Sequence, residues 1–367
     1  MSKHIVIDAR IINSSTGRYV ERLLTHLEKI DTENKYTVLV PSKDLRYWRP
    51  RSNNFKVKAA NYKNYSFNEQ VGFCVFLTKL RPDLVHFCMP QQPVLYMGKR
   101  VTTVHDLTLL NTYNSDKNWL IYHAKQFIGK YVFKAVGKFN KYIITPTEFV
   151  RKGFAEFANI PLSKITVTYE AADIIKRSTT PYEVPFTKFI MYVGAQSDYK
   201  NIKRLGDAHQ KLLKKYPTLG LVLVGKKTEM HLRNEKYFSK RGYKNLHFTD
   251  FIADEQLNWL FEKTDAYVFP SLSEGFGLPA LEAMSHGAPV ASSNATCLPE
   301  VYGDAALYFD PMATDDMVDK ISRILDDKDL RNELRKKGQE QVKKYSWDRM
   351  ATQTLEVYNE ALKDVKN

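Results

Sequence analysis

Short apolar runs alternate with longer amphipathic stretches along the first half of the chain. The apolar runs predict buried strands at Ile5–Ile7, Tyr36–Val40, Leu84–Phe87, Val101–Val104 and Tyr142–Thr145. Apolar positions spaced by three and four residues predict helices over Val20–Leu27 and Asn118–Phe139. Strands that alternate with helices are typical of a parallel sheet with helices on both faces.

The same alternation starts again in the second half. The expected strands are Phe189–Val193, Gly220–Val224, Leu246–Phe248, Ala266–Phe269, Pro289–Ala291 and Ala306–Phe309. Helical spacing separates them, for example over Leu205–Lys215 and Asp254–Lys263. Two such series predict an α/β protein made of two Rossmann-like, doubly wound domains.

Residues 174–187 mark the boundary between the two series. This stretch is polar and contains two prolines, which is typical of a linker. We therefore expect one domain over residues 1–173 and a second over residues 188–345. Residues 346–367 have a helical pattern that suits packing on either domain. A chain of 367 residues is long enough to form two cores.

Composition and charge narrow the class of protein. The chain is 43% hydrophobic and 26% charged, as in soluble globular proteins, and no apolar run approaches the ~18–20 residues of a membrane span. Three scattered cysteines form neither a disulfide framework nor a metal cluster, which predicts a cytoplasmic location. Residues 1–175 contain 26 Lys and Arg against 14 Asp and Glu, so they hold most of the net charge of +14 and would attract an anionic partner.

The stretch Phe269–Val290 carries the strongest chemical signal. A predicted strand ends at Phe269, a glycine-containing turn with Glu274 follows, and a helix is expected to start near Pro279. The amide donors and the dipole at such a helix start favour an anion such as a diphosphate. Eight residues after Glu274, the carboxylate of Glu282 is suited to accept hydrogen bonds from sugar hydroxyls.

Within this stretch, Pro270–Pro279 resembles the family 4 retaining glycosyltransferases of GT-B fold, whose second domain carries two glutamates separated by seven residues. The resemblance implies two Rossmann-like domains that face each other across a cleft, with a final helix that crosses back to the first domain. It also implies that Glu282 binds the ribose of the donor and that Glu274 lies near the donor sugar. The backbone amides expected to face the sugar or phosphate are those of Phe276, Gly277 and Leu278.

A second segment, Tyr192–Asn201, resembles the family's Gly-x(5)-Lys-Asn or Lys-Gly sequence. Gly194 would then lie at the donor site, and Lys200 would neutralise the departing diphosphate. The chain departs from the family because Ala195 and Tyr199 stand where many members have an arginine. The cations that we consider as replacements are Lys203, Arg204, Lys226 and Lys227.

Three weaker signals complete the expected site. His105 follows a predicted strand where family members often place a histidine that faces the donor sugar, whereas we interpret His86 as structural. Gly17 lies in a loop that resembles the family's glycine-containing loop at the cleft mouth. Phe251 and Ile252 fall where members contact the nucleobase through backbone groups.

The resemblance implies a hexosyltransferase that works with retention of anomeric configuration. The sequence has no Asp-x-Asp triplet, so we expect no metal site and no cofactor beyond the nucleoside diphosphate sugar that acts as donor. The resemblance suggests a lipid-linked or glycan acceptor in surface polysaccharide or glycolipid synthesis, with mannose as one candidate sugar.

The helix predicted over 118–139 bears on the acceptor side. Lys130, Lys134 and Lys138 share one helical face, while Ile128, Val132 and Phe139 fall elsewhere on the wheel. Such helices lie on acidic membrane surfaces, which predicts peripheral attachment to the inner membrane face. A core helix with a solvated lysine face explains the pattern equally well.

Three other functions remain open from the residues alone. One is a sugar-nucleotide epimerase or a phosphorylase on the same two-domain fold, although a phosphorylase would need a cofactor lysine and a longer chain. A basic nucleic-acid binder would explain the charge, but the chain lacks a known reading motif, so we expect no nucleic-acid partner. A dinucleotide oxidoreductase would require Gly-x-Gly-x-x-Gly after the first strand, and the chain has none there.

Overall fold

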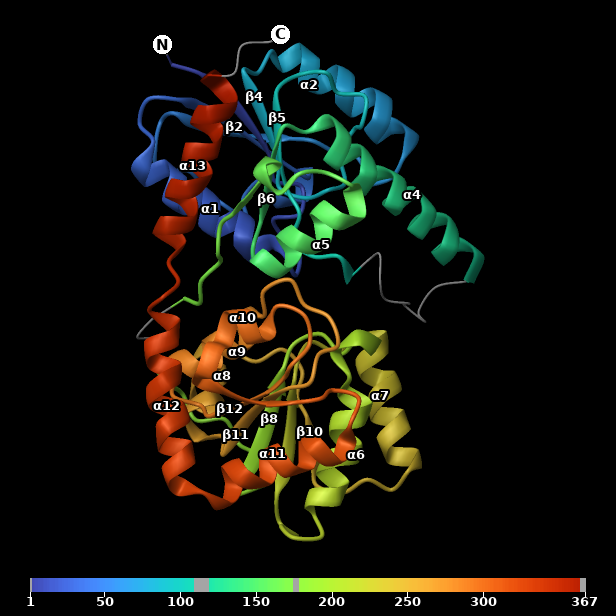
Figure 1. Cartoon of the computed structure of the whole chain (residues 1–367), viewed down its shortest axis with the longest axis vertical. Coiled ribbons are helices and arrows are strands. Elements are labelled where there is room, and N and C mark those ends of the chain that lie inside the picture. The colour runs from blue at the N-terminus through green and yellow to red at the C-terminus, as the bar shows by residue number, and fades with distance from the viewer. Residues whose placement is uncertain (1, 109–118, 174–177, 364–367) are drawn as a thin grey trace. The chain divides into compact units, whose positions relative to one another are not determined.

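The structure is a computed structural model that describes residues 2–108, 119–173 and 178–363 (Figure 1). The described residues form two compact units. The first contains residues from 2 to 170 together with 346–363, and the second contains those between 171 and 345. Each unit is built around its own parallel sheet, and each is described by itself.

The first unit contains a seven-stranded parallel sheet with the order β3-β2-β1-β4-β5-β6-β7. Its strands are β1 (His4–Asp8), β2 (Lys35–Val40), β3 (Phe55–Ala59), β4 (Leu84–Phe87), β5 (Arg100–Thr103), β6 (Tyr142–Thr145) and β7 (Ile165–Val167). The two edge strands, β3 and β7, were not predicted. Each has a half-exposed residue pattern rather than the continuous apolar run of a buried parallel strand.

Helices cover both faces of this sheet (Figure 1). They are α1 (Gly17–Ile30), α2 (Cys74–Leu80), α4 (Trp119–Phe139), α5 (Glu148–Ala158) and α13 (Trp347–Lys363), with short helices η1 (Ser42–Asp44), η2 (Glu69–Phe73) and η3 (Leu162–Lys164). Alternate side chains of strand β4 point to opposite faces of the sheet. Val85 and Phe87 pack with α2 on one face, whereas His86 bonds to Tyr358 of α13 on the other. Because α13 contacts α1 and β4–β6, the end of the described chain completes the first unit.

The second unit contains a six-stranded parallel sheet with the order β10-β9-β8-β11-β12-β13. The strands are β8 (Phe189–Val193), β9 (Gly220–Val224), β10 (Leu246–Phe248), β11 (Ala266–Phe269), β12 (Val290–Ser293) and β13 (Ala306–Phe309). Every strand predicted in this half is present. The strand order reverses between β8 and β11, so the turns after these two strands meet at the switch point where α/β sheets bind ligands.

The helices of the second unit lie on both sides of its sheet (Figure 1). They are α6 (Ile202–Leu212), α7 (Glu229–Lys240), α8 (Asp254–Lys263), α9 (Leu278–Ser285), α10 (Leu298–Tyr302), α11 (Thr314–Asp326) and α12 (Lys328–Val342), with η4 (Asp198–Lys200) and η5 (Gly303–Ala305). The helix expected near Pro279 begins one residue earlier, at Leu278. The predicted fold class, two doubly wound α/β domains, is confirmed.

No helix among the described residues combines the length and the apolar character needed to cross a membrane.

Candidate active site

The turns after β8 and β11 bring Lys200 and Glu274 together. The Nζ atom of Lys200 donates to Oε1 of Glu274 over 2.6 Å, although the two residues are 74 positions apart. Their side chains are only 13% and 12% exposed. The ammonium also lies 5.0 Å from the centre of the Tyr199 ring and 5.6 Å from that of Phe269. The two residues predicted from separate motifs therefore form one partly buried ion pair at the carboxyl edge of the sheet.

Asn201 fixes the loop that carries Lys200. Its Nδ2 atom donates to the carbonyl oxygens of Pro270 (3.1 Å) and Pro311 (2.8 Å), and its Oδ1 accepts from Arg204 (2.6 Å). Its φ of 62° is left-handed, a conformation that glycine and asparagine adopt at low cost. This explains physically why Asn or Gly follows the lysine in the motif, and it gives Asn201 a role that the sequence did not reveal.

The turn after Glu274 is held tightly against α10. Gly277 has a φ of 94° and caps α9, and a Cβ atom there would lie 2.2 Å from the hydroxyl oxygen of Tyr302. That hydroxyl donates to the carbonyl of Gly277 over 2.6 Å. The Phe276 side chain is 4% exposed and packs edge-on against Tyr345, so it belongs to the core. Only the backbone of Phe276 and Gly277 is therefore suited to meet a ligand.

Two consecutive residues bond to the backbone of Glu274. Its amide donates to Oγ1 of Thr296 over 3.1 Å, and the thiol of Cys297 donates to its carbonyl over 3.3 Å. Burial raises the pKa of the Cys297 thiol well above its usual value, which keeps the donor proton in place. Neither residue was predicted, because a side chain that bonds a distant backbone leaves no periodic trace in the sequence.

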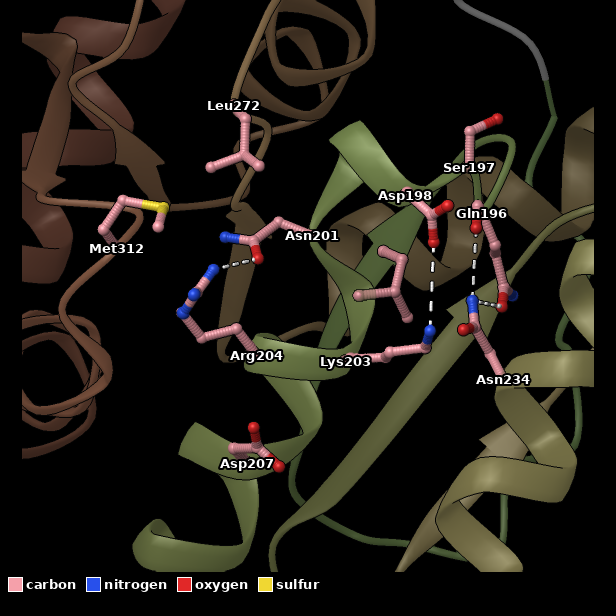
Figure 2. Close-up of a pocket in the computed structure, with 11 residues that line it drawn as sticks. Gln196, Ser197, Asp198, Asn201, Lys203, Arg204, Asp207, Asn234, Leu272 and Met312 are labelled. Atoms are coloured by element: carbon pink, nitrogen blue, oxygen red, sulfur yellow. Dashed lines mark hydrogen bonds and ion pairs between the residues drawn. The ribbon is translucent and has the colours of Figure 1, made fainter. Parts of the chain in front are cut away.

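A cavity of about 310 Å³ lies beside the Lys200 loop (Figure 2). Two of the cations considered as replacements for the missing arginine line it. In Figure 2, Lys203 faces Asp198 at 3.8 Å and Arg204 faces Asn201 at 2.6 Å. Both cations lie in the first turn of α6 and bond to residues of the preceding Lys200 loop.

In the first unit, His105 lies just after β5. Its Nε2 atom is 2.8 Å from the carbonyl oxygen of Cys88, and because a carbonyl only accepts, Nε2 carries the proton of this bond. Its Nδ1 atom lies 3.5 Å from Oε1 of Glu170, within ion-pair distance but without an aligned hydrogen bond. The ring forms a T-shaped contact with that of Tyr19, with 4.7 Å between the ring centres. Glu170 was not predicted, and it is the buried polar neighbour of this histidine.

His86 is fully buried, as its structural interpretation requires. Its two ring nitrogens lie 2.5 Å from the hydroxyl of Tyr358 and 2.8 Å from that of Thr103.

Gly17 begins α1, and a Cβ atom there would lie 1.9 Å from the carbonyl oxygen of Ile12. The absence of a side chain at Gly17 therefore lets its backbone lie close to Ile12 in the same loop. The predicted contact of Gly17 with the nucleotide-sugar donor stays a prediction.

Comparison with known proteins identifies the family. The sequence profile described as "Glycosyl transferases group 1" matches residues 183–341. The O-antigen chain mannosyltransferase B of Escherichia coli is 31% identical over 278 residues, which cover 71% of this chain and 70% of that protein. The chain belongs to the glycosyl transferases group 1 family.

Solved structures of similar fold align with nearly the whole length of this glycosyltransferase. Sucrose-phosphate synthase from Thermosynechococcus elongatus has a TM-score of 0.79 at 17% identity and covers 98% of this chain and 99% of its own. Anabaena Alr3699/HepE, solved in complex with UDP and glucose, has a TM-score of 0.74 at 16% identity and covers 98% and 100%. At these identities the likeness shows the fold alone, which is GT-B.

The turns after β9 and β10 of the glycosyltransferase are tied together by Asp250. Its Oδ1 atom accepts from the amides of Lys227 (3.0 Å) and Phe251 (2.8 Å), and these bonds lower the pKa of the carboxyl group. The side chain of Phe251 is 79% exposed, whereas Ile252 is half-buried. The predicted nucleobase contact thus falls on a braced turn with an exposed aromatic ring.

The remaining predicted donor residues lie on the same sheet edge or in the adjoining helix. Gly194 follows β8, and its amide donates to the carbonyl of Val224 over 3.0 Å. Glu282 lies in the second turn of α9, half-buried, and its carbonyl accepts from His286 over 3.0 Å. Within residues 2–108, 119–173 and 178–363, no group of three or more His, Cys, Asp or Glu side chains is placed to hold a metal ion.

Proposed function

We propose that this glycosyltransferase moves a hexose from a nucleoside diphosphate sugar to a glycan or lipid-linked acceptor during surface polysaccharide or glycolipid synthesis. The partly buried Lys200–Glu274 pair at the sheet's switch point is the observation that carries the proposal. Mannose is the first candidate sugar, since the relative in Escherichia coli is a mannosyltransferase of O-antigen chains. A nucleotide donor is supported by the UDP in the HepE complex.

The ion pair suits a reaction in which a diphosphate leaves. When the bond from the anomeric carbon to the diphosphate breaks, negative charge develops on the phosphate, and the ammonium of Lys200 is the group to stabilise it without a metal. The first turn of α9 adds amide donors and a favourable dipole. A bound diphosphate would replace Glu274 as the partner of Lys200, which leaves that carboxylate to orient the sugar.

Retention follows if the acceptor attacks on the face that the diphosphate leaves. The acceptor oxygen then bonds to the anomeric carbon, and its proton passes to the departing diphosphate. Glu282 is proposed to hold the ribose, the backbone at Phe276–Leu278 to face the phosphate, and His105 to orient the sugar. No cofactor beyond the donor is needed.

The test is turnover of Lys200→Ala across a panel of nucleoside diphosphate hexoses. Loss of the ammonium should lower turnover at least tenfold, about 1.4 kcal/mol in the barrier. Lys203→Ala is the matched control, because Lys203 is three residues away and pairs with Asp198 instead of Glu274. Equal rates for Lys200→Ala and the wild type would refute the assignment. Product analysis without acceptor distinguishes transfer from epimerisation.

The exposed face of α4 supports a membrane surface as the site of action. Lys130, Lys134 and Lys138 are exposed, and so are Phe127 (76%) and Tyr131 (62%) on the same face. Aromatic rings among lysines are typical of helices that lie in an anionic lipid interface. We therefore propose that α4 attaches the enzyme peripherally to the inner membrane face, where a lipid-linked acceptor is available.

Liposome co-sedimentation tests the attachment. Vesicles rich in phosphatidylglycerol should bind the protein more strongly than vesicles of phosphatidylcholine alone, and binding should weaken with salt. Changing Lys130, Lys134 and Lys138 together to Gln should remove the preference for anionic lipid, whereas Phe127→Ser should weaken binding to both. Equal recovery of the wild type with both vesicles would remove the membrane role but leave the transferase assignment intact.

A further inference from the structure

Thr296 is held in an unfavourable backbone conformation next to the Lys200–Glu274 pair. Its φ is 55°, in the left-handed region, where a β-branched side chain costs about 1–2 kcal/mol. The other non-glycine residues of positive φ in the described parts of the chain are Tyr65, Arg81, Asn159, Asn201 and Asn245, and none of these is β-branched. Such strain persists only where surrounding contacts impose it.

The contacts of Thr296 show what the strain achieves. Its Oγ1 accepts the amide of Glu274 over 3.1 Å, while the next residue, Cys297, donates its thiol to the carbonyl of Glu274 over 3.3 Å. Glu274 lies in an irregular turn, outside any helix or strand. The side chains of Thr296 and Cys297 therefore form the hydrogen bonds to the backbone N–H and C=O of Glu274 that a helix or strand would otherwise provide.

The same segment also holds the far end of the turn. Helix α10 begins directly after Cys297, and its residues Leu298 and Tyr302 supply the atoms that a Cβ on Gly277 would meet. Thr296, with its left-handed backbone, lies between β12 and α10. The segment from Thr296 to Tyr302 therefore contacts the Glu274–Gly277 turn at both ends. A relaxed backbone at position 296 would move the hydroxyl away from Glu274.

We propose that Thr296 is a positioning residue for Glu274, and that its strained conformation is retained for the reaction rather than for stability. The inference rests on the proposed role of Glu274 beside the donor sugar. Glycine at position 296 would relieve the strain but lose the hydroxyl, and serine would keep the hydroxyl with less steric cost.

Three variants separate these effects. Thr296→Gly should melt at the same temperature as the wild type or higher, yet its kcat should fall about tenfold, with KM for the donor changed less than about threefold. Thr296→Ser should recover most of the lost kcat, and Thr296→Ala should lose kcat without the gain in melting temperature. The split between kcat and KM matters because a merely structural residue would not lower kcat in a more stable protein.

Asn159→Gly is the control for a left-handed residue elsewhere, since Asn159 has a φ of 52° at the end of α5. Its kcat should match the wild type. Full kcat in Thr296→Gly, or no recovery in Thr296→Ser, overturns the inference, and the serine variant alone decides it if the glycine variant does not fold. If the Thr296 variants overturn the inference but Lys200→Ala is still impaired, the proposed function stands without a role for Thr296. If Lys200→Ala is unimpaired, the proposed function has failed first.

Discussion

At the scale of single residues, the first unit buries three charges together at the end of β1. Arg10 forms bonds of 2.8 Å to Asp8 and 2.9 Å to Glu69, and its guanidinium lies 4.2 Å from the centre of the Phe73 ring. Burial works against the charge of Arg10, but the two carboxylates outweigh it and raise its pKa. Burial raises the pKa of Glu69, an effect that Arg10 opposes. Removal of any one of the three would leave a buried charge without its partner.

Arg10→Met should therefore be strongly destabilising. Removing the cation leaves two buried carboxylates without a partner, which costs about 3–5 kcal/mol in comparable buried pairs. Urea unfolding measures the loss. Lys3→Met is the control, because Lys3 pairs with Asp83 at 43% and 42% exposure, and it should change stability by less than about 0.5 kcal/mol. Similar losses in both variants would contradict this account.

The buried His86 should make stability depend on pH. Burial, aided by the charge of His105, lowers the pKa of His86 from its ordinary value of 6.5 to about 3. The unfolded chain therefore binds a proton below pH 6.5 that the folded chain does not, so stability falls as the pH drops from 6.5 towards 3. The contribution is about 2 kcal/mol between pH ~7.5 and ~5. Between these two pH values, the free energy of unfolding of His86→Gln should fall by about 2 kcal/mol less than that of the wild type. Urea titrations at the two pH values would show the difference.

Lys200 and Glu274 could be singled out from the sequence, but the residues that hold the candidate site in place from distant segments could not. Lys200 and Glu274 each stand in a local motif, and the reversal of strand order then brings the motifs together. Asn201, Thr296 and Glu170 act through contacts with segments remote in sequence, and neither periodicity nor spacing reports such contacts.

At the scale of elements, the strands of the second sheet were all predicted because they are short, mostly apolar runs. Strand β9 is buried at every position, as expected where helices cover both faces. Strand β3 alternates inward-facing positions with the exposed Lys56 and Lys58, which suits an edge that must not pair further. Its charged pattern is therefore a consequence of its place in the sheet.

The turn that starts α9 should not tolerate a methyl group. Gly277→Ala would place a carbon 2.2 Å from the Tyr302 hydroxyl at a φ of 94°, so both the turn and the donor site should shift. We expect a loss of more than about 2 kcal/mol in stability and weaker binding of a nucleoside diphosphate, measured by thermal melting and calorimetry.

Gly242→Ala is the matched control for that variant. Gly242 has a φ of 66°, but apart from its two chain neighbours no described residue has an atom within 4 Å of the position that its Cβ would take. The substitution therefore bears only the cost of the left-handed backbone, about 1 kcal/mol. Nucleotide binding should be unchanged. Equal effects of the two substitutions would show that backbone conformation, not the clash with Tyr302, decides the outcome.

At the scale of the whole molecule, the donor should stabilise the protein by mass action. A ligand present at about a hundred times its Kd adds about 2.7 kcal/mol to the folded state. The nucleoside diphosphate sugar that is the true donor should therefore raise the melting temperature more than other members of a panel. Lys200→Ala should reduce that shift, because it removes the cation proposed to meet the diphosphate.

Helix α13 has a consequence for the order in which the protein is made. It packs against α1 and β4–β6, and Tyr358 reaches His86 in the middle of the first sheet. A ribosome releases this helix only after all of the second sheet, so the unit that is synthesised first is completed last. Until then its α1 face stays uncovered in the nascent polypeptide, and chaperone contacts during translation should concentrate there rather than on the later-made unit.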